Sequence, residues 1–332
     1  MRLNAPSLGA QAFLQPGDWQ AGVGFRWQRS DRHFTGDHED INRETEHSQV
    51  INDIYSMDLA VTYAVSKRFN LTLGIPFQLA ERSQVVRSND TQRTILQRFS
   101  THGDGLGDIR LLGAAWLFNP EKNQHGNVSL GLGVKFPTGE NDARDTFRVF
   151  DQTTQTIVNV RRTIDQSIQP GDGGWGAILD LFAFKEIFKN TTIYAAGTYI
   201  VNPEGTSGVP TYRSNPHEKV MSIADQYLGR IGLSYALLPK QGLSVSLAGR
   251  IEGVPVHDLI GSSQGFRRPG YAISIEPGVV WSKKGYTLSV SAPVALYRNR
   301  ERSVPDIETS PTAHGDAAFA DFVILAGFSR RF

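Results

Sequence analysis

Apolar and polar residues alternate along most of this chain, which is the pattern of β-strands with one apolar face. In the segment that begins at Trp19, every second residue through Trp27 is apolar. The same alternation returns near residues 55–65, 71–79, 109–117, 128–136, 174–186, 191–202, 224–238, 243–253, 271–281, 286–297 and 318–332. The pattern therefore predicts about twelve strands, each roughly ten residues long, and no amphipathic helix.

The connections between these segments alternate in length. Long connections are expected near residues 29–52, 88–106, 138–173, 203–223, 254–269 and 298–317, and short turns near 66–70, 119–127, 186–190, 238–242 and 282–285. Long loops on one side and short turns on the other are typical of transmembrane β-barrels, where the loops are extracellular and the turns periplasmic. The prediction is an all-β, antiparallel, up-and-down transmembrane barrel over residues 18–332. A soluble barrel is the alternative, but about twelve strands enclose more space than side chains readily fill.

The two faces of the predicted strands differ in chemistry. Charged residues of both signs share the polar face, where a dry core would make them costly and a wet lumen would not. We expect the lumen to be lined by Arg26, Asp58, Asp108, Arg110, Lys135, Asp180, Arg230, Arg250, Glu252, Glu276 and Asp321.

Aromatic residues gather near the strand ends on the apolar face, as in the two interfacial girdles of a barrel in lipid. The expected girdle consists of Trp19, Trp27, Tyr55, Tyr63, Trp175, Tyr227, Tyr235, Tyr271, Trp281 and Tyr286. The last strand carries Phe328 and ends in Phe332. This ending resembles the signal read by the barrel assembly machinery, although Arg330 stands where a hydrophobic residue is usual.

Composition narrows the possible partners. The 332 residues carry a formal net charge of +1, which gives no electrostatic footprint for nucleic acid. Cysteine is absent, which excludes disulfide bonds, thiolate metal sites and cysteine nucleophiles. The N-terminus lacks the charged and apolar regions of a signal peptide, so we take a leader to have been removed. The expected location is the bacterial outer membrane, with lipid and lipopolysaccharide around the barrel.

Candidate catalytic and metal-binding residues are few. All eight histidines fall in predicted loops or turns, and the local pairings are Ser100 with His102, and His257 with Asp258 and Ser262. The first long loop is rich in His, Asp and Glu between His33 and His47, a mixture that could bind a divalent cation, but without a known ligand spacing. We therefore predict no catalytic residue, no metal and no cofactor.

Four prolines interrupt predicted strands: Pro76, Pro137, Pro277 and Pro293. Proline removes a hydrogen-bond donor from the sheet, and a closed barrel has no edge to place it on, so we expect bulges.

Three segments outside the barrel wall also carry expectations. Residues 83–86 facing 94–99, and 146–150 facing 156–160, are predicted to form hairpins that extend the wall. The loop 138–173 is long enough to fold inward as a constriction or gate. Residues 1–17, which include Leu3, Leu8, Phe13 and Leu14, either enter the lumen as a plug or fray.

The stretch HGDGLGDI, residues 102–109, combines three glycines and two aspartates. A strand follows it rather than a helix, so a dinucleotide-binding turn is excluded, and it lacks the closing Glu of an EF-hand loop. We interpret it as a hinge where the chain bends into the barrel wall, with Asp108 pairing a cation across the barrel.

Three glycine-containing stretches resemble those of a family of outer-membrane barrels, the "MetA-pathway of phenol degradation" or transporter-like group. They are GDGLGDIRLLGAAWLF, GVKFPTGEND and QPGDGGWGAILDLFAF, in this order along the chain. The resemblance implies a barrel that binds or passes small hydrophobic compounds, and it brings no catalytic residues with it.

The sequence thus favours an outer-membrane channel for passive uptake of small, hydrophobic or aromatic molecules. A plugged barrel that serves as an anchor or subunit of an envelope complex is the alternative, and a barrel lipid hydrolase is a third reading.

Overall fold

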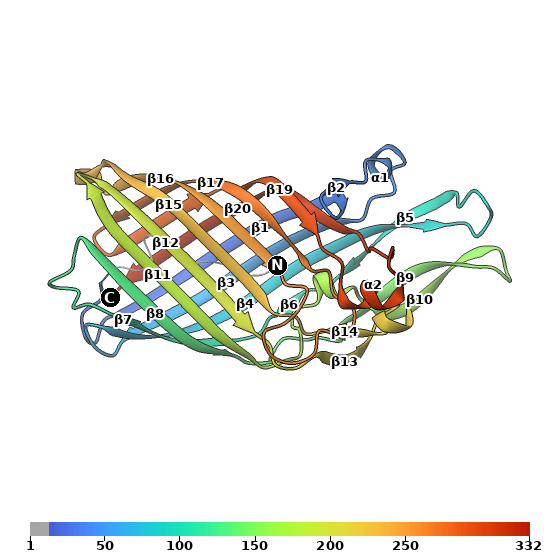
Figure 1. Ribbon diagram of the computed structural model, residues 1–332, viewed down its shortest axis with the longest axis horizontal. Helices are drawn as coiled ribbons and strands as arrows, with labels where there is room; N and C mark the ends of the chain where they lie inside the picture. The colour runs from blue at the N-terminus through green and yellow to red at the C-terminus, as the bar shows by residue number, and fades with distance from the viewer. Residues whose placement is uncertain (1–12) are drawn as a thin grey trace.

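The computed structural model describes residues 13–332, and it is a closed antiparallel barrel of twelve wall strands, as predicted (Figure 1). The wall strands are β1 (Trp19–Thr35), β3 (Ile51–Ala64), β4 (Phe69–Arg87), β7 (Arg110–Trp116), β8 (Gly126–Lys135), β11 (Gly176–Phe188), β12 (Thr191–Val201), β15 (Gln226–Leu238), β16 (Leu243–Val254), β17 (Gly270–Lys283), β18 (Tyr286–Ser291) continued by β19 (Val294–Arg300), and β20 (Ala317–Arg331). Each strand pairs with its sequence neighbour, and β20 closes the barrel on β1 from Gln20↔Arg331 to Phe34↔Ala317.

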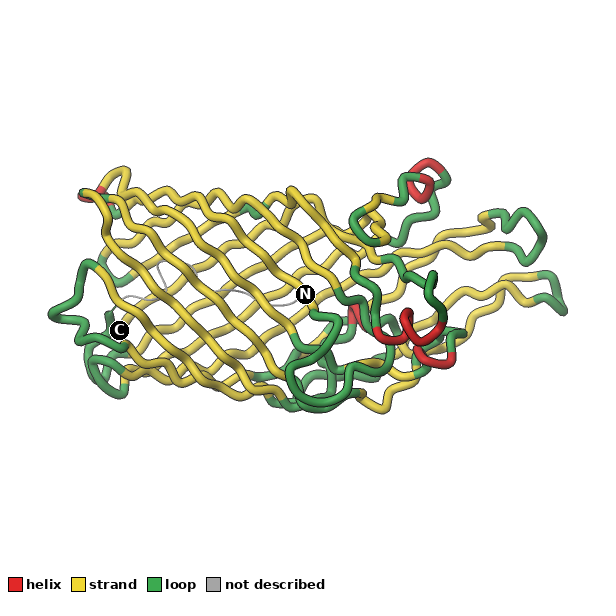
Figure 2. Tube along the Cα trace, viewed as in Figure 1, coloured by secondary structure: helices red, strands yellow, loops and turns green. Residues whose placement is uncertain are grey.

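Long loops leave one end of the barrel and short turns the other (Figure 2). The long-loop end carries β2 (His38–Glu39), α1 (Asn42–Thr45), β5 (Ile95–His102), β6 (Gly105–Leu106), β9 (Arg144–Asp151), β10 (Thr156–Thr163), η2 (Gln166–Ile168), β13 (Thr206–Pro210), η3 (Pro216–Glu218), β14 (Val220–Ser222) and α2 (Val304–Thr309), whereas η4 (Pro239–Gln241) lies in a short turn. Among the described residues, no helix is long and apolar enough to span a membrane.

Both predicted hairpins are confirmed. β4 pairs with β5 through Ser83↔Ser100, and β9 pairs with β10 through Phe150↔Ile157. They project beyond the barrel at the long-loop end (Figure 1). The expectation that no histidine lies in a strand was wrong. His33 lies in β1, which continues past the membrane-sized segment that alternation marks, and His38 in β2 and His102 in β5 lie in strands that form within the long loops.

The outer surface of the barrel is apolar. On β3, the side chains from Tyr55 to Tyr63 alternate between exposed apolar residues and buried or half-buried residues that face the interior. The rings of Trp19 and Tyr63 lie 4.7 Å apart near the short turns, and those of Trp27 and Tyr55 lie 6.5 Å apart near the loops. Eight residues of strand between the two pairs correspond to about 27 Å along the strand, or about 20 Å of height at a tilt of about 40°, which fits within the apolar band of a barrel in lipid.

The other predicted girdle residues divide between the same two ends. Tyr235, Trp281 and Tyr286 lie at the short-turn ends of β15, β17 and β18, whereas Tyr227 and Tyr271 begin β15 and β17 at the loop end. Trp175 lies just before β11, also at the loop end, and is exposed. Of the predicted assembly signal, Phe328 is exposed on β20, and the backbone N–H of Phe332 donates to Trp19 O at 2.8 Å. Its reading by the assembly machinery stays a prediction.

The prolines lie where the pairing is interrupted, not at bulges. Pro277 keeps register with Leu247 of β16, and its other side faces the break between β18 and β19 that contains Pro293. Pro76 likewise pairs regularly with Asp58 of β3 and faces the break between β6 and β7. Ala292 and Gly107 donate to the carbonyls of Pro277 and Pro76, so each missing N–H points at a break, where the sheet does not need it. Pro137 lies beyond the end of β8.

The apolar outer face gives a stability prediction. Leu59 lies midway between Tyr55 and Tyr63 and is exposed, whereas its neighbour Ala60 lines the interior. We expect Leu59→Arg to lower the free energy of unfolding in lipid vesicles by about 2–4 kcal/mol, since it places a charge in the hydrocarbon. Ala60→Arg is the matched control and should cost much less in a guanidinium titration. Equal losses for both variants would contradict the assignment of the two faces.

Candidate functional site

The interior of the barrel contains two cavities, one above the other along its axis. The cavity of the short-turn half has a volume of ≈ 330 Å³ and that of the loop half ≈ 340 Å³. Residues from strands all around the barrel line them. Asp58 and Arg110 line both cavities and form an ion pair, so the two cavities meet at this pair.

A second charged cluster also separates the two cavities; we call it the waist. It consists of Arg26, Arg230, Arg250, Glu252 and Glu276. Arg26 on β1 donates to Glu252 on β16 from its two terminal guanidinium nitrogens, at 2.8 and 3.2 Å. Between β1 and β16 the wall contains three strands, namely β17, β18 continued by β19, and β20. The ion pair between Arg26 and Glu252 therefore crosses the lumen instead of following the wall, and it narrows the lumen at this level.

The rest of the waist continues from Glu252 as a chain of ion pairs. Arg250 binds Glu252 at 2.6 Å and Glu276 at 3.3 Å, and Arg230 binds the other oxygen of Glu276 at 3.3 Å. Ser291 donates to Glu276 at 2.9 Å. Three guanidinium and two carboxylate groups leave one net positive charge, and mutual pairing fixes every side chain of the waist in place.

Sequence alternation placed most of the predicted lumen residues on the interior side. The two cavities are lined by Arg26, Asp58, Asp108, Arg110, Lys135, Asp180, Arg230, Glu252 and Glu276, while Arg250 is buried between Glu252 and Glu276. Asp321 is a correction. It lines neither cavity, and its side chain is 52% exposed, bound to Arg32 and Arg298. The β1–β20 register shifts on both sides of Ser30, and that irregularity breaks the alternation on which the prediction rested.

Part of the lumen wall is apolar, and the sequence reading missed it. Leu112, Ile178, Ile200 and Leu228 form one buried cluster on β7, β11, β12 and β15. A second cluster lies nearer the short turns and contains Trp116, Phe182, Tyr194, Ala196 and Ala248. We call the two clusters together the apolar lane. The run Leu111–Phe118, apolar at both parities, was the available signal, because a strand with one wet face would alternate.

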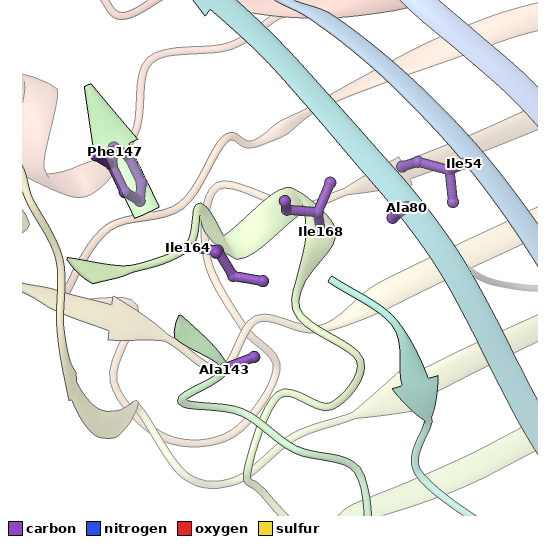
Figure 3. Close-up of a cluster of buried hydrophobic side chains, with 6 residues drawn as sticks. All are labelled: Ile54, Ala80, Ala143, Phe147, Ile164 and Ile168. Atoms are coloured by element: carbon purple, nitrogen blue, oxygen red, sulfur yellow. The ribbon is translucent and has the colours of Figure 1, made fainter. Parts of the chain in front are cut away.

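The loop between β8 and β11 folds inward over the mouth of the barrel, as one of the predicted alternatives had it. Its segment 164–175 contains η2, and we call this segment the lid. Gln78 of β4 donates to Ile168 O at 2.9 Å, and Gln166 reaches Ser222 of β14 on the other side at 2.5 Å. Ile164 and Ile168 are fully buried and turn toward Ile54 and Ala80 of the wall (Figure 3). The lid therefore spans the extracellular mouth.

Asp165 is the main polar anchor of the lid. Its carboxylate receives two hydrogen bonds from Arg268, at 2.8 and 2.9 Å, and one from Tyr212 at 2.8 Å, while Arg82 of β4 lies 3.5 Å away. Burial alone would raise the pKa of Asp165, but the charges of Arg268 and Arg82 outweigh it and hold that pKa well below its usual value. Asp165 therefore stays ionised and ties the lid to three other parts of the chain.

The three glycine-containing stretches of the sequence meet at the lid, and the third of them begins within it. A Cβ on Gly103 would lie 1.9 Å from Ile168 O, and one on Gly139 would lie 2.7 Å from Gly171 Cα. Glycine is needed at these positions because the backbones approach so closely. The stretch HGDGLGDI therefore packs closely against the lid and also forms the bend before β7. Asp108 accepts from the backbone of Gly139 and Asp172 and lies 4.0 Å from Lys135 on neighbouring β8, rather than pairing across the barrel.

The described end of the N-terminal segment lies inside the barrel. Phe13 packs edge-on against Trp116, with ring centroids 4.9 Å apart. Leu14 is buried and lines the cavity of the short-turn half. The predicted plug also included Leu3 and Leu8, which fall outside the described residues. Phe13 and Leu14 thus add to the apolar lane at the periplasmic end.

The candidate catalytic and metal groups do not assemble. Ser100 donates to Glu81 rather than to His102, whose ring nitrogen lies 3.3 Å from Asp145, and Asp258 binds Arg267 rather than His257. Within residues 13–332, no group of His, Asp and Glu side chains is arranged to hold a metal ion.

The lid anchor predicts a pH response. Because the folded Asp165 carboxylate has the lower pKa, its ion pairs stabilise the closed lid above the usual value of 3.8 and are lost only as pH falls through the folded pKa. Accessibility of the lid should therefore stay constant from pH 5 to 8. The measurement is maleimide labelling of a Ser167→Cys variant, in a chain with no other cysteine, with each rate divided by that of free cysteine at the same pH because the reactive thiolate fraction rises with pH.

Removing the carboxylate should open the lid at neutral pH. Asp165→Asn leaves Arg268 and Arg82 without their anion, a change that costs about 3 kcal/mol for a buried pair. We expect labelling at position 167 to accelerate at least tenfold, as a ~1.4 kcal/mol shift already gives a factor of ten. Asp151→Asn, at the exposed tip of the same loop, is the control. Unchanged labelling in Asp165→Asn would show that the anchor does not hold the lid.

Comparison with known proteins supports the fold. No family model and no curated protein matches the sequence. An outer membrane channel from Pseudomonas putida F1 superposes with a TM-score of 0.59 at 12% identity, over 99% of this chain and 100% of that one. The CymD monoaromatic hydrocarbon channel has a TM-score of 0.46 at 8% identity, over 96% of this chain and 89% of that one. The first similarity agrees with the family resemblance seen in the sequence, and this chain has the fold of an outer-membrane channel.

Proposed function

We propose that the protein is a passive outer-membrane channel for small molecules with an apolar or aromatic part. The observation that carries this proposal is the apolar lane on the lumen wall. A pore that served only ions or sugars would gain nothing from Leu112, Trp116 and Ile178 lining its interior, because apolar surface in contact with water is costly. The fold shared with a solved outer membrane channel agrees with this reading.

The waist gives the channel its second property. Arg26, Arg250 and Glu252 form fixed ion pairs across the lumen, and the apolar lane begins beside them on β15 and β16. A solute passing between the cavities meets paired charges, which neither hold it strongly nor need to be displaced. Neutral molecules with a ring that slides along the lane and a polar end toward the waist fit both features.

A plugged barrel that presents its loops to an envelope protein is the second candidate. The observation in its favour is the lid, which several side chains tie across the mouth in the described structure. A lipid hydrolase has no such support, because Ser100 and His102 do not form a hydrogen-bonded pair within the described residues.

Reconstituted vesicles test the proposal directly. We expect phenyl glucoside to enter faster than glucose in a swelling assay, although it is the larger solute, because its ring contacts the apolar lane. Glucose is the reference that size alone would favour. Entry of neither solute, together with no conductance in a planar bilayer, would support the plugged barrel instead.

Variants of the lane should remove this preference. Ile178→Asn with Leu228→Asn replaces two buried apolar side chains of the lane by polar ones. We expect glucose then to enter faster than phenyl glucoside, in barrels that still show heat-modifiable migration on gels. Ser289→Asn on β18 is the control. Ser289 lines the same cavity of the short-turn half but belongs to neither lane cluster, so this variant should keep the wild-type order. An unchanged order in the double variant would mean that the lane does not select the solute.

A further inference from the structure

A basic cavity lies outside the barrel, between the base of the β9–β10 hairpin and the loop that contains β13. Its volume is ≈ 390 Å³. Five cationic side chains line it, namely Arg144, Arg161, Arg162, Arg213 and Lys219, and no acidic residue does. The remaining lining residues include Thr163, Thr211 and Tyr212, each of which bears a hydroxyl group. The waist and the lane take no part in this cavity.

Three of these cations lack a partner. Arg144, Arg161 and Arg162 form no ion pair and no side-chain hydrogen bond with any residue from 13 to 332. Several other arginines at this end of the barrel do form ion pairs: Arg32 binds Glu39 and Asp321, and Arg267 binds Asp258. Arg144 and Arg161 also border a neighbouring cavity that contains Glu140 and Asp142, without forming an ion pair with either.

Arg213 forms the inner wall of the cavity, in surroundings that disfavour its positive charge. Burial and the nearby charge of Arg268 both lower the pKa of Arg213. Asp165 lies 3.9 Å from one Arg213 nitrogen, but the same carboxylate is also bound by Arg268 and Tyr212. The buried Nε of Arg213 has no hydrogen-bond acceptor among the described residues. Like charges gathered in this way repel each other unless an anion binds between them.

We propose that this cavity binds a phosphate group. Phosphate supplies two negative charges and several strong acceptor oxygens, which match a cluster of guanidinium groups better than a carboxylate does. The cavity belongs to the extracellular loops, at the base of the hairpin, where Arg144 pairs in register with Thr163. Two sources present phosphate on that side: the phosphorylated sugars of lipopolysaccharide and free phosphate-bearing anions in the medium.

The proposal is tested by binding measurements on the whole folded protein in neutral detergent. The probes are inorganic phosphate in a calorimeter, and intact or enzymatically dephosphorylated lipopolysaccharide in a pull-down titration. The variant is Arg161→Gln with Arg162→Gln, which removes two cations outside the barrel wall. The control is Arg148→Gln with Lys122→Gln, which removes the same charge from the same hairpin outside the cavity and from a periplasmic turn. Heat-modifiable migration verifies that every variant is folded.

We expect the double variant Arg161→Gln with Arg162→Gln to weaken phosphate binding at least tenfold and the control to leave it unchanged. If binding of intact lipopolysaccharide falls in parallel, and dephosphorylated lipopolysaccharide binds as weakly as the variant does, the phosphate comes from the lipid. If only inorganic phosphate is affected, the site serves free anions. If the variant binds both intact lipopolysaccharide and inorganic phosphate as the wild type does, the proposal is overturned.

Discussion

A chain that crosses a bilayer must satisfy every backbone hydrogen bond within itself, and the rest of this structure depends on that constraint. The pairing of β20 with β1 removes the free edges of the sheet. The prolines obey the same constraint, since Pro76 and Pro277 point their missing donors at breaks in the neighbouring strands. A closed wall of twelve strands encloses more space than side chains fill. The interior is therefore a lumen, and the side chains that line it determine what the lumen can bind or pass.

The lining of that lumen serves two tasks, and β15 and β16 contribute to both. The waist places buried charges where each finds a partner of opposite sign, which is the condition for keeping charges inside a protein at tolerable cost. Beside it, the apolar lane offers rings and branched side chains to a solute, and Arg230 of the waist lies 5.8 Å from the ring centre of Tyr194 in the lane. The lid lies above both and is held by one buried carboxylate, Asp165, so access to the lumen depends on a small number of polar contacts.

Alternation in the sequence predicted the barrel, its strand count and most of the lumen charges, because a strand between lipid and water has only two environments. It failed where that condition fails. Asp321 follows a register shift that no sequence pattern marks, and Ile178 faces a lumen that is locally apolar. The lid anchor was also out of reach, because Asp165 and Arg268 are far apart in sequence and meet only when two loops fold over the mouth. The glycine-rich stretch HGDGLGDI was recognised as a bend in the sequence, but the sequence did not show that the lid packs against it.

The central claim is that solutes enter through a lumen which the lid closes. A disulfide between Asn52→Cys and Ser167→Cys tests it most directly, since the native side chains lie 3.4 Å apart across the lid and the wall, and the chain has no other cysteine. Vesicles that contain the oxidised variant should exclude phenyl glucoside, and reduction should restore its entry to the wild-type rate. Equal entry before and after reduction, with the disulfide verified, would contradict the account.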